Sequence, residues 1–214
     1  MTRHIFILAA LALLCAARGA PAIAAAQATP AAQATPHAPE APDSDAGDLD
    51  AVMHLLAMRR HGRVEFVEQQ FLAMLDRPVE SSGELRYDAP DRLEKRTLKP
   101  HPETLALAGG VLTVERGRSR HVLDLHAYPQ IQPFVESIRA TLAGDRSALE
   151  RIFHVEFAGS VARWTITLVP VERQVAKNVA QVQIDGSSDQ LLEVEIRQPD
   201  GDRSLMTLRA IAAP

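Results

Sequence analysis

Histidine and carboxylate side chains stand close together in "HVLDLH", and such groups serve as metal ligands or as general acids and bases. The stretch contains His121, Asp124 and His126. On a strand, Asp124 and His126 share one face while His121 lies on the other. A metal would therefore need a third ligand from a distant segment, and outward-facing polar residues are the simpler interpretation.

A pair of acidic residues, Glu193 and Glu195, has the spacing that places both carboxylates on one face of a strand. Such a pair could act as general acid and general base. The intervening Leu192, Val194 and Ile196 form an apolar face opposite to it. This alternation is typical of a half-buried strand with one solvated face, so we do not assign catalysis to the pair.

Motifs for the common enzyme classes are missing from the sequence. It contains no G-x-S-x-G, no P-loop and no dinucleotide fingerprint. The single cysteine, Cys15, lies in the N-terminal leader, so the rest of the chain has no thiol for a disulfide or for catalysis. We expect no catalytic residue, no metal site and no cofactor, and therefore a protein that is not an enzyme.

The N-terminal residues 1–24 predict a cleaved signal peptide. A basic start precedes an apolar run at 5–17, and Ala-Ile-Ala at 22–24 fits a signal peptidase site. The apolar run is shorter than the roughly 20 residues of a membrane-spanning helix, and no other segment approaches that length, so we expect no stable membrane insertion. Removal of residues 1–24 takes away two arginines and changes the formal net charge from −4 to −6. This acidic balance argues against nucleic acid as a partner.

Residues 25–47 are rich in alanine, proline and polar side chains, and they predict a disordered linker. Residues 48–214 then form one domain. Asp48 is the expected N-cap of a helix that Gly62 ends, and a strand is expected around 64–71. Segments in which apolar and polar residues alternate follow, and they predict strands joined by tight turns at glycines. The expected turns are at Gly109-Gly110, Arg116-Gly117, Asp185-Gly186 and Asp200-Gly201.

Helical spacing of apolar residues returns between 129 and 153, with Asp145 as the expected cap of the second of two short helices. The order is a helix, antiparallel strands, two helices and more antiparallel strands. We therefore predict an α+β fold in which amphipathic helices cover the apolar side of an antiparallel sheet. The pattern leaves open whether that side encloses a packed core or a cavity.

Several motifs follow one another in an order that resembles the LolA family, the periplasmic carriers of outer-membrane lipoproteins. They are Gly83-Glu84-Leu85 before Pro90, the Gly109-Gly110-Val111-Leu112 hairpin, "WTITLVP" at 164–170, and Asp185-Gly186. The resemblance covers nearly all of the predicted domain. It implies an incomplete antiparallel β-barrel, a curved sheet whose concave side holds acyl chains under a helical lid.

The resemblance assigns apolar residues on one face of the strands to the wall of a lipid-binding cavity. The predicted wall consists of Leu85, Tyr87, Leu93, Leu105, Leu107, Leu123, Leu125, Trp164, Ile166, Leu168, Val182, Ile184, Leu192, Val194 and Ile196. The predicted inner face of the lid consists of Phe134, Ile138, Leu142 and Ile152. Each of these residues could equally be an ordinary core residue.

Two departures from the family pattern indicate a divergent branch. The well-known carriers have an arginine directly before the proline of the second strand, and it latches the lid; here that residue is Ala89. A latch would then be absent or moved to a neighbour such as Arg92. The chain is also only 4% aromatic, whereas the familiar cavities are lined with aromatic side chains.

The resemblance implies a monomeric periplasmic protein that binds the acyl chains of a lipoprotein or lipid and carries them towards the outer membrane. It implies an inner-membrane release complex and an outer-membrane acceptor as partners. Two alternatives stay open. One is a lipid-sensing regulatory protein of the same fold, and the other is a carrier of a lipid-linked product that is not a lipoprotein. An enzyme that acts on a lipid is not favoured, because the sequence shows no catalytic constellation.

Overall fold

The computed structural model describes residues 42–128 and 132–211. The predicted signal peptide and residues 25–41 of the predicted linker lie outside this part of the chain. Eleven strands form one antiparallel sheet, in the order β6-β5-β4-β3-β2-β1-β11-β10-β9-β8-β7. The strands are β1 (His61–Phe71), β2 (Val79–Asp88), β3 (Arg92–Lys99), β4 (Glu103–Ala108), β5 (Val111–Arg116), β6 (Ser119–Asp124), β7 (Phe153–Ser160), β8 (Arg163–Pro170), β9 (Gln181–Ser187), β10 (Gln190–Arg197) and β11 (Arg203–Ala210).

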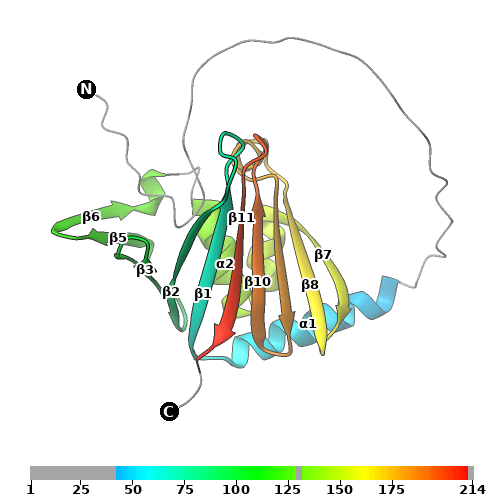
Figure 1. Ribbon diagram of the computed structural model, residues 1–214. Helices are drawn as coiled ribbons and strands as arrows, with labels where there is room; N and C mark the ends of the chain where they lie inside the picture. Colours follow the sequence, from blue (N-terminus) through cyan, green and yellow to red (C-terminus); the bar gives the residue numbers. More distant parts are fainter. Residues whose placement is uncertain (1–41, 129–131, 212–214) are drawn as a thin grey trace, which may run out of the picture.

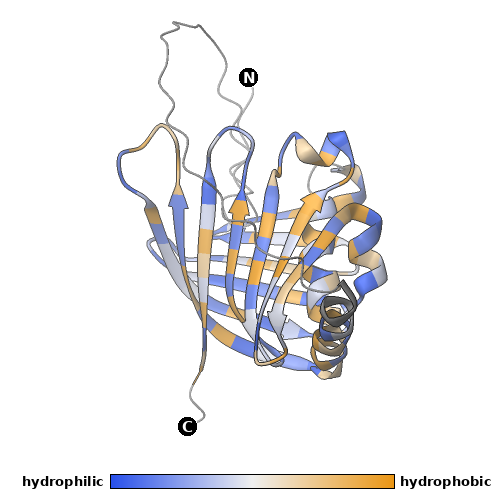
Figure 2. Cartoon of the chain, turned by 90° about the vertical axis from the view of Figure 1, so that its right-hand side faces the viewer, coloured by the Kyte–Doolittle hydropathy of each residue, from blue (hydrophilic) through white to orange (hydrophobic). Residues whose placement is uncertain are grey.

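The sheet curves strongly but does not close. Its two edges are β6 and β7, and β1 joins the two halves of the chain by pairing with both β2 and β11. The strands β3, β5 and β6 are turned away from β10 and β11 (Figure 1). Hydrophobic and hydrophilic residues alternate along the strands (Figure 2), as the period of two requires when one face of a sheet is covered. The predicted α+β fold with an incomplete antiparallel barrel is confirmed.

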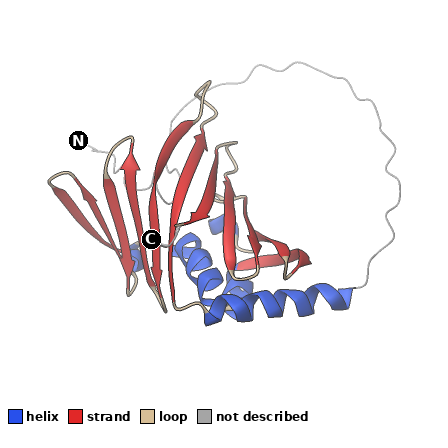
Figure 3. Cartoon of the chain, turned by 60° about the horizontal axis from the view of Figure 1, so that its bottom comes forward, coloured by secondary structure: helices blue, strands red, loops and turns tan. Residues whose placement is uncertain are grey.

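Helices gather on one side of the curved sheet (Figure 3). They are α1 (Pro42–Met58), η1 (Leu125–Ala127), α2 (Gln132–Ala143), α3 (Arg146–Ile152) and α4 (Arg173–Ala176). The expected start at Asp48 is wrong, because α1 begins six residues earlier, at a proline, which suits the first position of a helix. None of the helices in the described ranges is long and apolar enough to cross a bilayer.

The turns follow the expected glycines with one exception. Gly109 and Gly110 both have positive φ and join β4 to β5, and Gly117 and Gly201 also have positive φ in the expected turns. The turn expected at Asp185-Gly186 is wrong, because both residues lie inside β9 and the chain reverses after Ser187. A Cβ on Gly186 would lie 2.1 Å from the Trp164 ring, so this glycine makes room for the indole instead of a turn.

Two apolar clusters fill the space between helices and sheet. The larger contains residues of α1 such as Val52 and Leu56 with β8 and β9 residues such as Trp164 and Ile184. The smaller contains Leu105, Leu112 and Val135 and lies under the β4–β5 hairpin. The helix α1 therefore covers the β7–β9 end of the concave face, and this placement decides which strands remain available to line a cavity.

The junction between α2 and α3 is tied tightly to α1. Gly144 has a φ of +64°, and a Cβ there would lie 2.1 Å from the backbone oxygen of Met53. Asp145 caps α3 as predicted, since its carboxylate accepts a 2.9 Å hydrogen bond from the Ala148 N–H. This bond and a second from the Ser147 hydroxyl hold the pKa of Asp145 below its usual range.

We expect the substitution Gly144→Ala to lower the free energy of unfolding by roughly 2–4 kcal/mol, because it adds backbone strain and a steric overlap with α1. The fluorescence of Trp164, the only tryptophan in the sequence and 1% exposed, reports unfolding in a urea titration. Gly109→Ala is the matched control: its φ is +56° and nothing lies within 4 Å of the added carbon. An equal loss in both variants would show that the contact with α1 contributes nothing.

Candidate functional site

A cavity of about 200 Å³ lies between α2 and the concave face of the sheet. This volume is many times the about 10–15 Å³ that one water molecule needs. The wall comes from β1 to β5, β10 and β11, from Leu56 of α1 and from three residues of α2. Most of the wall is aliphatic, so the cavity offers an apolar molecule a surface that water does not compete for.

The structure brings together about half of the predicted wall. The predicted residues that line the cavity are Leu85, Tyr87, Leu93, Leu105, Leu107, Leu192, Val194 and Ile196. They come from β2, β3, β4 and β10, on the face that the sequence alternation assigned to the interior. The cavity is also lined by residues that were not predicted, among them Val64, Leu112, Met206 and Leu208.

The other predicted wall residues lie elsewhere. Trp164, Ile166, Leu168, Val182 and Ile184 are at most 2% exposed and pack in the larger apolar cluster. The physical reason is that α1 already covers β8 and β9, so these side chains contact a helix. Leu123 and Leu125 pack in the smaller cluster, and Leu125 belongs to η1 and not to a strand.

The predicted lid residues are also divided between the cavity wall and the apolar core. Ile138 and Leu142 of α2 line the cavity, together with Val135. Ile152 packs against the larger apolar cluster at the end of α3. Phe134 lies in α2, but its side chain is outside what the structure describes. The wall on the helical side is therefore provided by α2, while α3 contributes to the core.

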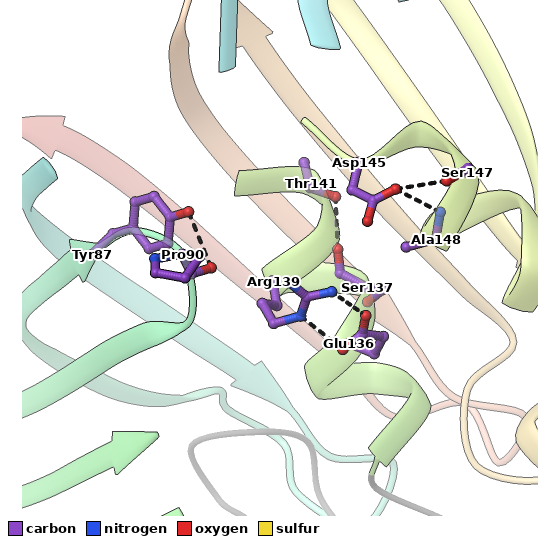
Figure 4. A network of polar contacts seen from close by, with 9 residues as sticks. All are labelled: Tyr87, Pro90, Glu136, Ser137, Arg139, Thr141, Asp145, Ser147 and Ala148. Carbon is purple, nitrogen blue, oxygen red and sulfur yellow. Dashed lines mark hydrogen bonds and ion pairs between the residues drawn. The ribbon is translucent and has the colours of Figure 1, made fainter. Parts of the chain in front are cut away.

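The latch position is shown in Figure 4, where Tyr87, Pro90 and α2 lie near one another. The Tyr87 hydroxyl donates to the Pro90 carbonyl at 3.5 Å, and Arg139 of α2 forms an ion pair with Glu136 of the same helix. Burial raises the pKa of Tyr87, although the positive charge of Arg139 opposes this rise. The Arg92 side chain is exposed and forms no side-chain hydrogen bond or ion pair with the other described residues, so a latch at Arg92 stays a prediction.

One charged pair on the cavity wall was not predicted. Glu68 of β1 and Lys95 of β3 form an ion pair of 2.7 Å, and their side chains are only 4% and 8% exposed. Both residues line the cavity. The sequence contains a signal for them, since Glu68 is two residues from Phe66, and Lys95 two from Leu93, on inward faces.

Glu195, one of the two carboxylates first considered for catalysis, has structural partners. Glu195 forms ion pairs with Arg197 and Arg203 at 2.7 and 3.2 Å. Burial raises the pKa of Glu195, but the hydrogen bonds from these arginines outweigh burial, and the pKa lies below its usual value. The carboxylate is thus ionised and paired. Within residues 42–128 and 132–211, no group of three histidine, cysteine or acidic side chains could hold a metal ion.

Comparison with known proteins identifies the family. A family model described as "Outer membrane lipoprotein carrier protein LolA-like" matches residues 41–214. The chain belongs to this LolA-like family. The match spans the sheet and all the helices that form the cavity of this LolA-like protein. No curated protein matches it at the level of sequence.

Solved structures similar to this LolA-like chain are distant. A LolA superfamily protein from Nitrosomonas europaea is 9% identical, with a TM-score of 0.38 over 78% of this chain and 95% of that one. A DUF1329 family protein from Desulfovibrio piger is 9% identical, with a TM-score of 0.45 over 78% and 92%. The matching chain of the Pseudomonas aeruginosa MucA/MucB complex is 14% identical, with a TM-score of 0.43 over 78% of this chain and 58% of that one.

Proposed function

We propose that this LolA-like protein is a periplasmic carrier that holds the acyl chains of a lipoprotein or lipid in its cavity and moves them towards the outer membrane. The observation that carries the proposal is the aliphatic cavity between α2 and the open sheet. Each methylene group transferred from water to such a surface contributes about 0.8 kcal/mol. Residues 1–24 are the proposed signal peptide that brings the protein to the periplasm.

A carrier must also release its cargo, and two features of the chain suit this requirement. The sheet is open at β6 and β7, so the wall of the cavity is not a closed barrel. Arg139, the arginine of α2, donates its hydrogen bonds to Glu136 of the same helix and not to a strand. We propose that α2 acts as a lid held mainly by apolar contacts, which separate and re-form with little directional cost.

The proposal extends to the partners. An inner-membrane complex would load the cargo, and an outer-membrane acceptor or the membrane itself would receive it. We propose that the protein works as a monomer that binds lipid stoichiometrically and without turnover. The cavity residues of β2 to β4 and β10, with Ile138 and Leu142 of α2, are the proposed binding residues.

Lipid extraction tests the proposal directly. We expect protein purified from the periplasm to contain acyl-chain lipid at up to about one equivalent, identified by mass spectrometry, and to take up an apolar fluorescent probe when delipidated. Conversion of the bound lipid to product would instead indicate an enzyme. Absence of both lipid and probe binding would contradict the proposal, and a tightly bound inner-membrane protein in place of lipid would favour a regulatory role.

A further inference from the structure

The ion pair of Glu68 and Lys95 belongs to a larger polar end of the cavity. Glu68 accepts three hydrogen bonds, from Lys95 Nζ at 2.7 Å, from Ser204 Oγ at 2.8 Å and from Ser81 Oγ at 3.1 Å. The Lys95 ammonium also lies 4.8 Å from the centre of the Phe66 ring. Four neighbouring strands thus contribute to one polar group of residues: Glu68 and Gln70 of β1, Ser81 of β2, Lys95 and Thr97 of β3, and Ser204 of β11.

This polar end lies at a definite depth. Gly62 and Glu68 both line the cavity and are six residues apart on β1, which corresponds to roughly 20 Å along an extended strand. Arg59 and Asp189 line the cavity near Gly62 and are part-exposed. Val64 of β1 and its register partner Leu85 of β2 line the wall between the two ends. A bound molecule therefore meets an apolar middle and a buried polar end.

Stability alone gives no reason for charges at this place. Removing two opposite charges from water costs more than their attraction returns in many proteins, and apolar replacements of a buried pair are often neutral or stabilising. Aliphatic side chains at 68 and 95 would continue the wall that Leu85, Leu93 and Leu208 form. The pair interrupts this wall where a ligand would contact it, which points to recognition of the ligand.

The charge of the pair defines the chemistry that it accepts. Glu68 and Lys95 together are neutral, so a carboxylate placed beside them would leave one net negative charge in a site lined mainly by apolar side chains. An uncharged group with a hydroxyl or an ester adds no charge. A carboxylate has about four lone-pair positions, and Glu68 uses three of them in its hydrogen bonds with Lys95, Ser81 and Ser204. A ligand hydroxyl can donate to the fourth.

We propose that the polar end recognises an uncharged hydrogen-bond donor, such as a hydroxyl, on an otherwise apolar ligand, and that Glu68 and Lys95 select against a carboxylate there. This inference rests on the proposed binding of acyl chains. It adds a specificity-determining pair to an otherwise apolar cavity. A purely aliphatic wall would instead disfavour any polar group of the ligand, because the group would lose its hydrogen bonds to water.

Competition between two amphiphiles of equal chain length tests the proposal. Monohexadecanoylglycerol and hexadecanoate displace an apolar fluorescent probe from delipidated protein, at a pH well above the carboxyl pKa of about 4. We expect the wild-type protein to bind the glyceride at least about tenfold more tightly than the carboxylate. In the variant Glu68→Gln, which retains Lys95, the preference should shift towards the carboxylate by a similar factor.

If Glu68→Gln does not fold, a double variant that removes both charges tests the same selectivity. In Glu68→Leu/Lys95→Met we expect the ratio of the two Kd values to fall close to one, with probe binding retained. The matched control Arg63→Met/Glu84→Met removes an exposed ion pair of 2.8 Å from β1 and β2 and should leave the ratio unchanged. An unchanged ratio in the double variant, or a wild-type preference for hexadecanoate, would overturn the inference. Failure of the wild-type protein to bind either amphiphile would overturn the proposed function itself.

Discussion

The substitution Glu68→Leu is expected to lower the free energy of unfolding by roughly 3–5 kcal/mol, because it leaves the Lys95 charge buried without its carboxylate. The Lys95 side chain is 8% exposed, so its ammonium group is surrounded mainly by protein atoms, which stabilise an unpaired charge less than bulk water does. Ser81 and Ser204 lose their acceptor in the same step. A urea titration followed by Trp164 fluorescence measures the change.

The double substitution Glu68→Leu/Lys95→Met is the informative comparison. We expect it to recover most of the loss, since two apolar side chains of similar volume replace the pair and no buried charge is left. The exposed pair Arg63–Glu84 on the outer face of β1 and β2 should contribute less than about 1 kcal/mol when it is removed. A double variant as unstable as Glu68→Leu would show that the pair is required for folding and would weaken its assignment to ligand recognition.

Local signals in the sequence were sufficient for most of the fold. The paired glycines at 109 and 110 predicted a hairpin because such a turn needs two residues with positive φ, and Asp145 predicted a helix start because its carboxylate can accept from the first-turn N–H groups. The turn at Asp185-Gly186 failed for a tertiary reason. Its glycine is required by the Trp164 ring, which comes from another strand.

The division between cavity and core could not be predicted from alternation alone. Ile166 on β8 and Val194 on β10 both face inward, but Ile166 is fully buried in the larger apolar cluster, whereas Val194 is only partly buried at its margin and lines the cavity. Which helix covers which strands depends on packing across the whole domain. The buried ion pair was missed for a related reason. A single charged residue in an apolar strand face predicts exposure by default, and its partner lies 27 residues away in the sequence.

The substitution Leu142→Glu is expected to weaken acyl-chain binding at least about tenfold, which corresponds to about 1.4 kcal/mol. Leu142 lines the cavity from α2, and a carboxylate there would either lie against the bound chain without hydrogen-bond partners or hold the lid away from it. Its partial exposure in the lipid-free protein allows the charge to reach water, so the loss of stability should be much smaller than the loss of binding.

Two controls separate the lid from a general effect of charge on α2. Gln132→Glu adds the same negative charge at an exposed position of the same helix and should bind the apolar probe as the wild-type protein does. Leu142→Met keeps the volume and the apolar surface and should also bind normally. If Leu142→Glu binds the probe as well as these two controls do, the side chain at 142 does not contact the bound acyl chain, and the assignment of α2 as the lid is wrong.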